Sequence, residues 1–183
     1  MKTYLPSVIK LFEYYKELGE KTFEQVSEEN LFWQYNEASN NIATIVKHLS
    51  GNMISRWTDL LNSDGEKDWR NRDFEFENDI ESREQMIAVW NKGWACLFDA
   101  LNNLTEADLT KQIFIRNMEH TVTEAINRQL THYAYHIGQI VFIGKMVVNE
   151  KWNSLSIPRG GSKKYNKEKF PKSKRKEHFT DNL

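Results

Sequence analysis

The chain has 183 residues, of which 39% are hydrophobic and 13% aromatic, so it can bury one core and is not disordered throughout. Basic and acidic residues nearly balance, but residues 159–183 carry a net charge of +6 and the remainder a net charge of −7. Three prolines and eight glycines are too few turn-forming residues for an all-β sandwich or barrel, so helix is expected.

The first two predicted helices follow from apolar residues repeated at helical spacing. One stripe covers about residues 5–26, with Pro6 near the start, where a missing N–H costs nothing. A second stripe follows the N-cap candidates Ser39 and Asn40 and ends before the turn-forming segment 62–65. Each stripe predicts an amphipathic helix that buries its apolar face.

The next two predicted helices each begin with a capping box, in which a side chain and a backbone N–H bond reciprocally. Ser82 and Gln85 open a helix that continues to about residue 101. Thr121 and Glu124 open the longest and most apolar helix, which continues to about residue 148.

Four such helices predict an all-α fold, a four-helix bundle with one shared core. The links 62–81 and 102–120 are each close to twenty residues, whereas up-and-down bundles use links of about 2 to 8. We therefore expect long crossover connections, and links of this length often cover a functional site. Beyond residues 112–115, no alternating pattern predicts a strand.

The charge asymmetry sets the C-terminal segment apart. We expect residues 1–158 to form the bundle and residues 159–183 to be a flexible basic tail. The segment 163–176 could contact the phosphates of a nucleic acid. A solvated tail is the favoured interpretation, because blocks of like charge usually stay in water.

Nothing in the sequence indicates export or a membrane. Cys96 is the only cysteine, so no internal disulfide can form. The first ten residues lack the apolar core of a signal peptide, and the most apolar run, 137–148, is interrupted by Gln139 and Lys145. We expect a cytoplasmic protein.

Three histidines are candidate metal ligands. His132 and His136 stand at positions i and i+4 of the last predicted helix, about 6 Å apart on one face. His48 lies on the inward face of the second predicted helix. Three imidazoles would leave open positions on an ion, as catalytic sites do. Histidines that only form hydrogen bonds within the core are the alternative.

Competing motifs are absent. A di-iron bundle needs Glu-x-x-His, but Gln129 stands three residues before His132. A zinc protease needs His-Glu-x-x-His, but Tyr133 follows His132. There is neither a phosphate-binding glycine loop nor a Gly-x-Ser-x-Gly nucleophile elbow. The sequence therefore argues against di-iron chemistry and peptide hydrolysis.

Charged residues near the candidate ligands have simpler interpretations. Arg56 and Arg128 could bind a carboxylate, but ion pairs on the helix surface, such as Glu124 with Arg128, are favoured. The charged run in the first long link is interpreted as a network of ion pairs, unless that link crosses the mouth of the site. Its members are Arg70, Arg72, Asp73 and Glu75.

Several segments together resemble the DinB-like, or YfiT-like, metal-binding four-helix bundles, and within them an uncharacterised subfamily of small bacterial proteins. The resemblance covers about residues 5–166. It is carried by residues 127–140, residues 48–52, Ser55-Arg56-Trp57, Asp64-Gly65-Glu66-Lys67, and residues 155–160.

The resemblance implies one divalent ion, zinc or nickel, held by His48, His132 and His136. It also implies chemistry with a low-molecular-weight thiol, since related members include S-transferases and isomerases that use bacillithiol, mycothiol or glutathione. Asn52 and Gln139 are candidates to orient a ligand or the second nitrogen of a histidine, with surface amides as the alternative.

The leading hypothesis is therefore a metal-dependent enzyme that transfers or rearranges a thiol-linked group on a small-molecule substrate. The alternative is a non-catalytic bundle in which the metal or the histidines stabilise the fold or a homodimer. A third hypothesis, nucleic-acid association through the basic tail, is not favoured. The sequence assigns no general acid or base.

Overall fold

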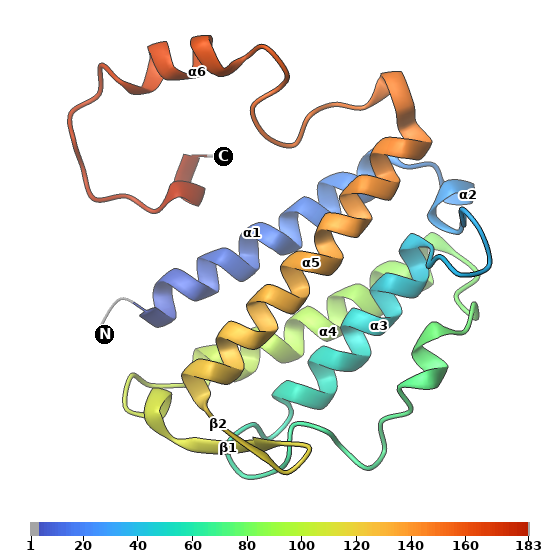
Figure 1. Cartoon of the computed structure of the whole chain (residues 1–183), viewed down its shortest axis with the longest axis vertical. Helices are drawn as coiled ribbons and strands as arrows, with labels where there is room; N and C mark the ends of the chain where they lie inside the picture. Colours follow the sequence, from blue (N-terminus) through green and yellow to red (C-terminus); the bar gives the residue numbers. More distant parts are fainter. Residues whose placement is uncertain (1–3, 183) are drawn as a thin grey trace.

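The computed structural model describes residues 4–182 and is mostly helical (Figure 1). Its four long helices are α1 (Tyr4–Gln25), α3 (Ile42–Trp57), α4 (Arg83–Asn103) and α5 (Val122–Val148). Two shorter helices are α2 (Glu28–Leu31) and α6 (Ser162–Lys169). The 3₁₀ helices are η1 (Asp73–Phe76), η2 (Asp108–Thr110), η3 (Asn149–Lys151) and η4 (Phe179–Asn182).

The long helices begin where their sequences provide caps. The Ser82 side chain accepts from the Gln85 N–H, and the predicted capping box of Thr121 and Glu124 is present at the start of α5. For α3, the cap is Asn41, whose side chain accepts from the Thr44 N–H at 2.8 Å, rather than Ser39 or Asn40.

The long helices pack as two parallel pairs. The start of α1 contacts the start of α5, where the Tyr4 hydroxyl donates to Asn127 Oδ1 at 2.6 Å. The start of α4 lies at the opposite end, where the Arg83 guanidinium donates to the carbonyl oxygens of Phe23 and Val26 at 2.8 and 2.6 Å. Thus α1 and α5 run in one direction, and α3 and α4 run together in the other (Figure 1).

The two long links take different paths between the helices. Residues 58–82 leave the end of α3 and return along it to the far end of the molecule, so this link is a crossover, as expected (Figure 1). Residues 104–121 stay at one end of the molecule, where they join the end of α4 to the start of α5, so this link does not run along the helices as the first one does. The first link is important for the site, because η1 within it packs against α3.

The second link contains an antiparallel hairpin of β1 (Gln112–Ile115) and β2 (Met118–Thr121). Its turn residues Arg116 and Asn117 both have positive φ, 54° and 59°. The Asp64 carboxylate accepts from both of their backbone N–H groups at 2.8 Å. The first link therefore holds the hairpin in place. The strand β2 was not anticipated from the sequence.

The core is rich in aromatic side chains. Phe12, Trp57, Trp94 and Tyr133 are each at most 2% exposed and contact one another edge to face or tilted. At Gly93 a β-carbon would stand 2.7 Å from the Ser50 backbone, so α3 and α4 approach closely because this residue lacks a side chain.

The C-terminal segment lies outside this core. No described residue after position 144 is buried. Near its end, the segment contacts α1, where Phe179 packs edge to face against Tyr14 with ring centroids 5.5 Å apart. The flexibility expected for residues 159–183 stays a prediction.

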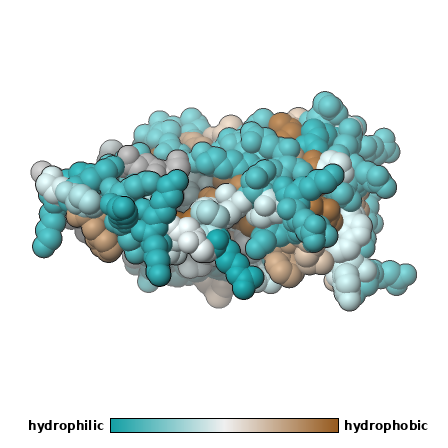
Figure 2. Space-filling model, turned by 90° about the horizontal axis from the view of Figure 1, so that it is seen from above, coloured by the Kyte–Doolittle hydropathy of each residue, from teal (hydrophilic) through white to brown (hydrophobic). Residues whose placement is uncertain are grey.

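The face shown in Figure 2 is mostly hydrophilic, with small separate hydrophobic areas. Throughout residues 4–182, every helix is too short or too polar to cross a lipid bilayer.

Candidate metal centre

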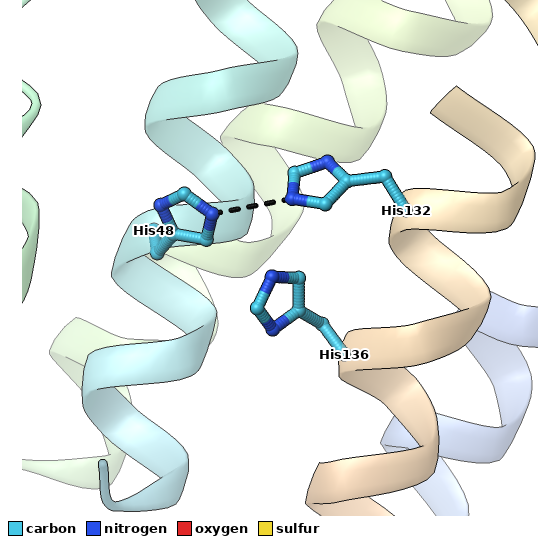
Figure 3. A group of neighbouring side chains, drawn as sticks. All are labelled: His48, His132 and His136. Atoms are coloured by element: carbon cyan, nitrogen blue, oxygen red, sulfur yellow. Dashed lines mark hydrogen bonds between the residues drawn. The ribbon is translucent and has the colours of Figure 1, made fainter. Parts of the chain in front are cut away.

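Three imidazole rings converge between α3 and α5 (Figure 3). Each of His48, His132 and His136 offers one ring nitrogen, and these nitrogens all lie within 4.8 Å of one another. The Nε2 atoms of His48 and His132 are 3.3 Å apart. His48 is 5% exposed, and the other two histidines are half-buried. The sequence places these residues on inward faces, and the structure brings them together.

Helix phase explains the convergence. On α5, Tyr133 and Ile137 are buried in the core, and the two histidines border that stripe on the side of α3. On α3, His48 lies beside buried Leu49 and stacks on Phe76 of η1, with ring centroids 4.9 Å apart. The first link therefore closes the site from the side opposite α5.

A buried carboxylate orients His48. The Nδ1 atom of His48 lies 2.9 Å from Glu75 Oε2, and Glu75 is 5% exposed. Burial alone raises the pKa of Glu75, but hydrogen bonds from His48 and Arg70 outweigh it and hold this pKa below its ordinary value. An ionised Glu75 can only accept, so His48 donates through Nδ1. Its Nε2 lone pair is left facing the other two rings.

An amide orients His136 in the same way. The Nδ1 atom of His136 lies 2.9 Å from Gln139 Oε1, three residues along α5. A carbonyl oxygen accepts, so Nδ1 donates and Nε2 carries the free lone pair. Gln139 was predicted to orient either a ligand or the second nitrogen of a histidine, and this hydrogen bond is the contact that the second role requires.

Asn52 does not bond a histidine nitrogen, and its role in orienting a ligand stays a prediction. Its Oδ1 accepts from the Tyr133 hydroxyl at 3.0 Å, and that hydroxyl accepts from Trp57 Nε1 at 3.0 Å. Asn52 lines the pocket beside the histidines, but Glu75 takes the position at the second nitrogen of His48. Asn52 therefore joins α3 to α5 through the core.

Burial keeps the imidazoles in the form that binds metals. Burial, with His136 and His48 close by, lowers the pKa of His132 to about 3. Burial also lowers the pKa of His136. Both rings are therefore neutral at neutral pH, as ligation requires.

The spacing of His48 and His132 fits a divalent ion. Two nitrogens bound to zinc at about 2.0–2.1 Å in tetrahedral geometry lie about 3.3 Å apart. The separation between His48 Nε2 and His132 Nε2 is 3.3 Å. Imidazole ligands suit zinc, nickel, copper and iron.

A network of ion pairs continues from His48 to the edge of the site. Arg70 binds both oxygens of Glu75, at 2.7 and 2.9 Å, and also donates to Glu66 at 2.9 Å. Glu66 accepts from Arg56 at 2.8 Å and lies 3.4 Å from Arg116. Hydrogen bonding to these cations lowers the pKa of Glu66, although its partial burial opposes the shift.

The same network explains part of the sequence signature. The Ser55 hydroxyl donates to the Gly65 carbonyl oxygen at 3.0 Å and accepts from the Lys67 N–H at 3.2 Å. Arg56 also donates to the Gly65 carbonyl and is 5% exposed. Arg56 therefore anchors the first link from inside, and its interpretation as a helix-surface ion pair was wrong.

The histidines line an open pocket of about 460 Å³. Its lining residues come from the segment before α3, from α3 and α5, from the first link and from the hairpin. They are Asn40, His48, Asn52, Arg56, Arg70, Arg72, Phe76, Arg116, Arg128, Gln129, His132, Tyr135, His136 and Gln139.

The sequence did not identify Glu75 or Arg70 as part of the site. They belong to the charged run interpreted as a loop network unless the link crossed the site, and the link does cross it. No spacing rule connects Glu75 to His48, because the contact depends on the path of a long link rather than on helical periodicity.

Comparison with known proteins gives one match. A family model described as "Protein of unknown function (DUF1572)" matches residues 1–161. The matched range contains the three histidines and all the residues that line the pocket. No curated protein and no solved structure matches the chain.

Proposed function

This chain belongs to the DUF1572 family of proteins of unknown function, and we propose that it is a divalent-metal-dependent enzyme whose ligands are His48, His132 and His136. The observation that carries the proposal is the convergence of three imidazoles beside an open pocket. Structural zinc sites use four protein ligands, whereas catalytic sites use three and keep one position for a ligand. The donor set therefore favours catalysis over a purely structural role.

The metal that we propose is zinc or nickel, and its fourth ligand is a small thiol. When bound, such an ion favours the thiolate form of the thiol, which is the nucleophilic form. The chain's own cysteine does not line the pocket: Cys96 lies on α4, with its Sγ 3.5 Å from the Thr58 hydroxyl. A thiol reaction here therefore uses a thiol from solution.

The fold that we propose is a DinB-like four-helix bundle made of α1, α3, α4 and α5. Two features support it. The sequence motifs resemble that group, and the candidate ligands come from the second and fourth long helices, as the resemblance implies. Thiol-dependent S-transfer or isomerisation is the reaction that accompanies this proposal.

The chain's own residues prepare the site in three ways. Glu75 and Gln139 fix the protonated nitrogens of His48 and His136, so that the free lone pairs point inward. Burial keeps His132 and His136 neutral. The stacked ring of Phe76 restricts His48 and shields one face of it from water.

The first experiment is metal analysis of the purified protein. We expect about one equivalent of zinc or nickel, and loss of that metal in the triple variant His48→Ala, His132→Ala, His136→Ala. The matched control is His120→Ala, because His120 lies on β2 outside the cluster and bonds the Met118 carbonyl oxygen. The proposal would be contradicted if the wild-type protein, the triple variant and His120→Ala all contained the same amount of metal, well below one equivalent.

A second experiment separates catalysis from a structural metal. The cobalt-substituted protein is titrated with small thiols, and a shift in its absorption spectrum on thiol addition supports an open position. A spectrum unchanged by thiols, together with a large loss of thermal stability on chelation, would identify the non-catalytic alternative instead.

A further inference from the structure

The pocket beside the histidines is unusually rich in arginine. Five arginines line it, although residues 1–158 as a whole carry a net charge of −7. They converge from four different segments. Arg56 comes from α3, Arg70 and Arg72 from the first link, Arg116 from the hairpin turn and Arg128 from α5. Because the arginines come from separate elements, a local run of basic residues in the sequence does not explain why they cluster.

Two of these arginines are neutralised. Arg56 and Arg70 are held by the carboxylates of Glu66 and Glu75. A third carboxylate, Asp64, lies at the hairpin and is bonded to backbone N–H groups of the turn. Even with Asp64 counted, the cations outnumber the anions around the pocket.

The other three arginines face the pocket with little compensation. Arg116 reaches Glu66 only at 3.4 Å and is 52% exposed, while Arg56 and Arg70 bind the same carboxylate more closely. Arg128 bonds the His120 ring at 3.2 Å, and Arg72 lies 5.1 Å from the centre of the Phe76 ring. Neither partner is a carboxylate, so the positive charge remains available.

The backbone conformation of Arg116 is energetically unfavourable. A two-residue turn with positive φ at both positions normally uses Asn-Gly or Asp-Gly, because a β-carbon disfavours this conformation. Here the first position is Arg116, with φ of 54°. The backbone N–H groups of Arg116 and Asn117 both donate to the Asp64 carboxylate, and these bonds stabilise the turn. Asp64 therefore holds Arg116 at the pocket.

Two buried polar atoms on residues that line the pocket have no hydrogen-bond partner among the described residues. Arg56 Nε is a donor and Gln129 Oε1 is an acceptor. Arg56 is 5% and Gln129 3% exposed, and both residues line the pocket. Buried polar groups are nearly always paired, so two unpaired atoms on residues beside the same pocket are an exception to that rule.

From these observations we propose that the pocket binds a small molecule carrying an oxyanion, a carboxylate or a phosphate, beside the metal. Arg72, Arg116 and Arg128 hold the oxyanion, since guanidinium groups bind such groups in bidentate fashion. A volume of about 460 Å³ suits a small molecule.

This inference names the substrate class for the proposed function and rests on it for the position of the anion beside the metal. The arginine cluster itself does not need the metal. In an S-transferase, the oxyanion would belong to the thiol or to the molecule that it attacks, and both would be held next to the three histidines.

Calorimetric titration of the full chain at low salt tests the proposal. The probes are inorganic phosphate and succinate, with uncharged succinamide as the matched control. We expect at least one anion to bind and succinamide not to bind. Tighter binding of succinate identifies a carboxylate, and tighter binding of phosphate identifies a phosphate. No binding of either anion, or equal binding of succinamide, would overturn the proposal.

Variants locate the binding. Arg116→Gln and Arg128→Gln should each weaken anion binding about tenfold, which is typical for loss of one charge-assisted contact. Arg159→Gln is the control, because Arg159 is exposed and does not line the pocket. Circular dichroism checks that each variant folds. Equal affinity in all three variants would refute the arginine assignment.

Failure of the metal proposal can be told apart from failure of this one. If the triple histidine variant still binds the anion in an arginine-dependent way, while the wild-type protein holds no metal, the oxyanion site stands and the metal function fails. If metal content is normal but Arg116→Gln and Arg128→Gln bind the anion as tightly as the wild-type protein, the oxyanion site fails and the metal function stands.

Discussion

Gly51 of α3 lies directly against the carboxylate of Glu75, so close that a β-carbon at this position would stand 2.7 Å from Glu75 Cδ. The side chain of Glu75 is held from the other side by Arg70 and by His48. It therefore has little room to move away. Gly51 lies three residues after His48 on the same helix. Because it has no side chain, the first link can bring a carboxylate to that histidine.

Replacing Gly51 therefore tests whether the Glu75 contact matters for metal binding. Gly51→Ala should displace Glu75 from His48 and weaken metal affinity by about tenfold or more, as loss of a partner to a ligating histidine does. Competition with a chelator measures the affinity. Gly138→Ala on α5 is the control, because a β-carbon there meets nothing within 4 Å. That control should keep its metal affinity and gain about 0.5–1 kcal/mol of stability. Equal metal affinity in the two variants would contradict the prediction.

Removing the charge of Glu75 should have a similar effect on the metal. Glu75→Gln keeps the size of the side chain but loses the ionised acceptor, so metal affinity should fall by about 10- to 100-fold. It also leaves Arg70 buried with one of its two carboxylate partners lost, which lowers the free energy of unfolding. Glu77→Gln, on an exposed neighbour in the same link, is the control. Unchanged chelator competition in Glu75→Gln would exclude a role for the carboxylate.

How far the sequence predicts this molecule depends on the range of the interactions involved. The long helices are predicted because their signals are local: apolar spacing within α5, for example, and the capping box of Thr121 and Glu124. The inward direction of His48, His132 and His136 follows from the same helical phase. That these rings bind a metal remains a prediction.

What the sequence does not predict is set by tertiary structure. Glu75 reaches His48 only because the first link returns along α3, and no periodic pattern encodes that path. The strand β2 forms because β1 is beside it and Asp64 fixes the turn, although its own sequence does not alternate. Arg56 is buried because Glu66 and the Gly65 carbonyl oxygen meet it there.

The chain of hydrogen bonds through Tyr133 predicts a stability effect separate from metal binding. Tyr133→Phe deprives Trp57 Nε1 and Asn52 Oδ1 of their partner in the core. The free energy of unfolding should fall by about 1–3 kcal/mol, the usual cost of leaving buried polar groups unpaired. Urea denaturation measures it. Tyr135→Phe is the control, because the Tyr135 side chain is 63% exposed and its change should be within about 0.5 kcal/mol.

Metal content should be normal in both tyrosine variants, because neither hydroxyl is a candidate ligand. A Tyr133→Phe protein as stable as Tyr135→Phe would show that the bonded chain contributes nothing measurable to folding.

Metal addition should itself stabilise the fold, because the candidate ligands join α3 to α5 and are brought together only in the folded chain. At a free metal concentration 100 times the Kd, binding to the folded state alone adds about 2.7 kcal/mol. Chelator-treated protein should therefore melt at a lower temperature than protein with zinc or nickel restored. The triple variant with His48, His132 and His136 replaced by alanine should show no such difference, whereas His120→Ala should behave as the wild-type protein does. A melting temperature that rises equally in the triple variant would mean that the metal binds elsewhere on the chain.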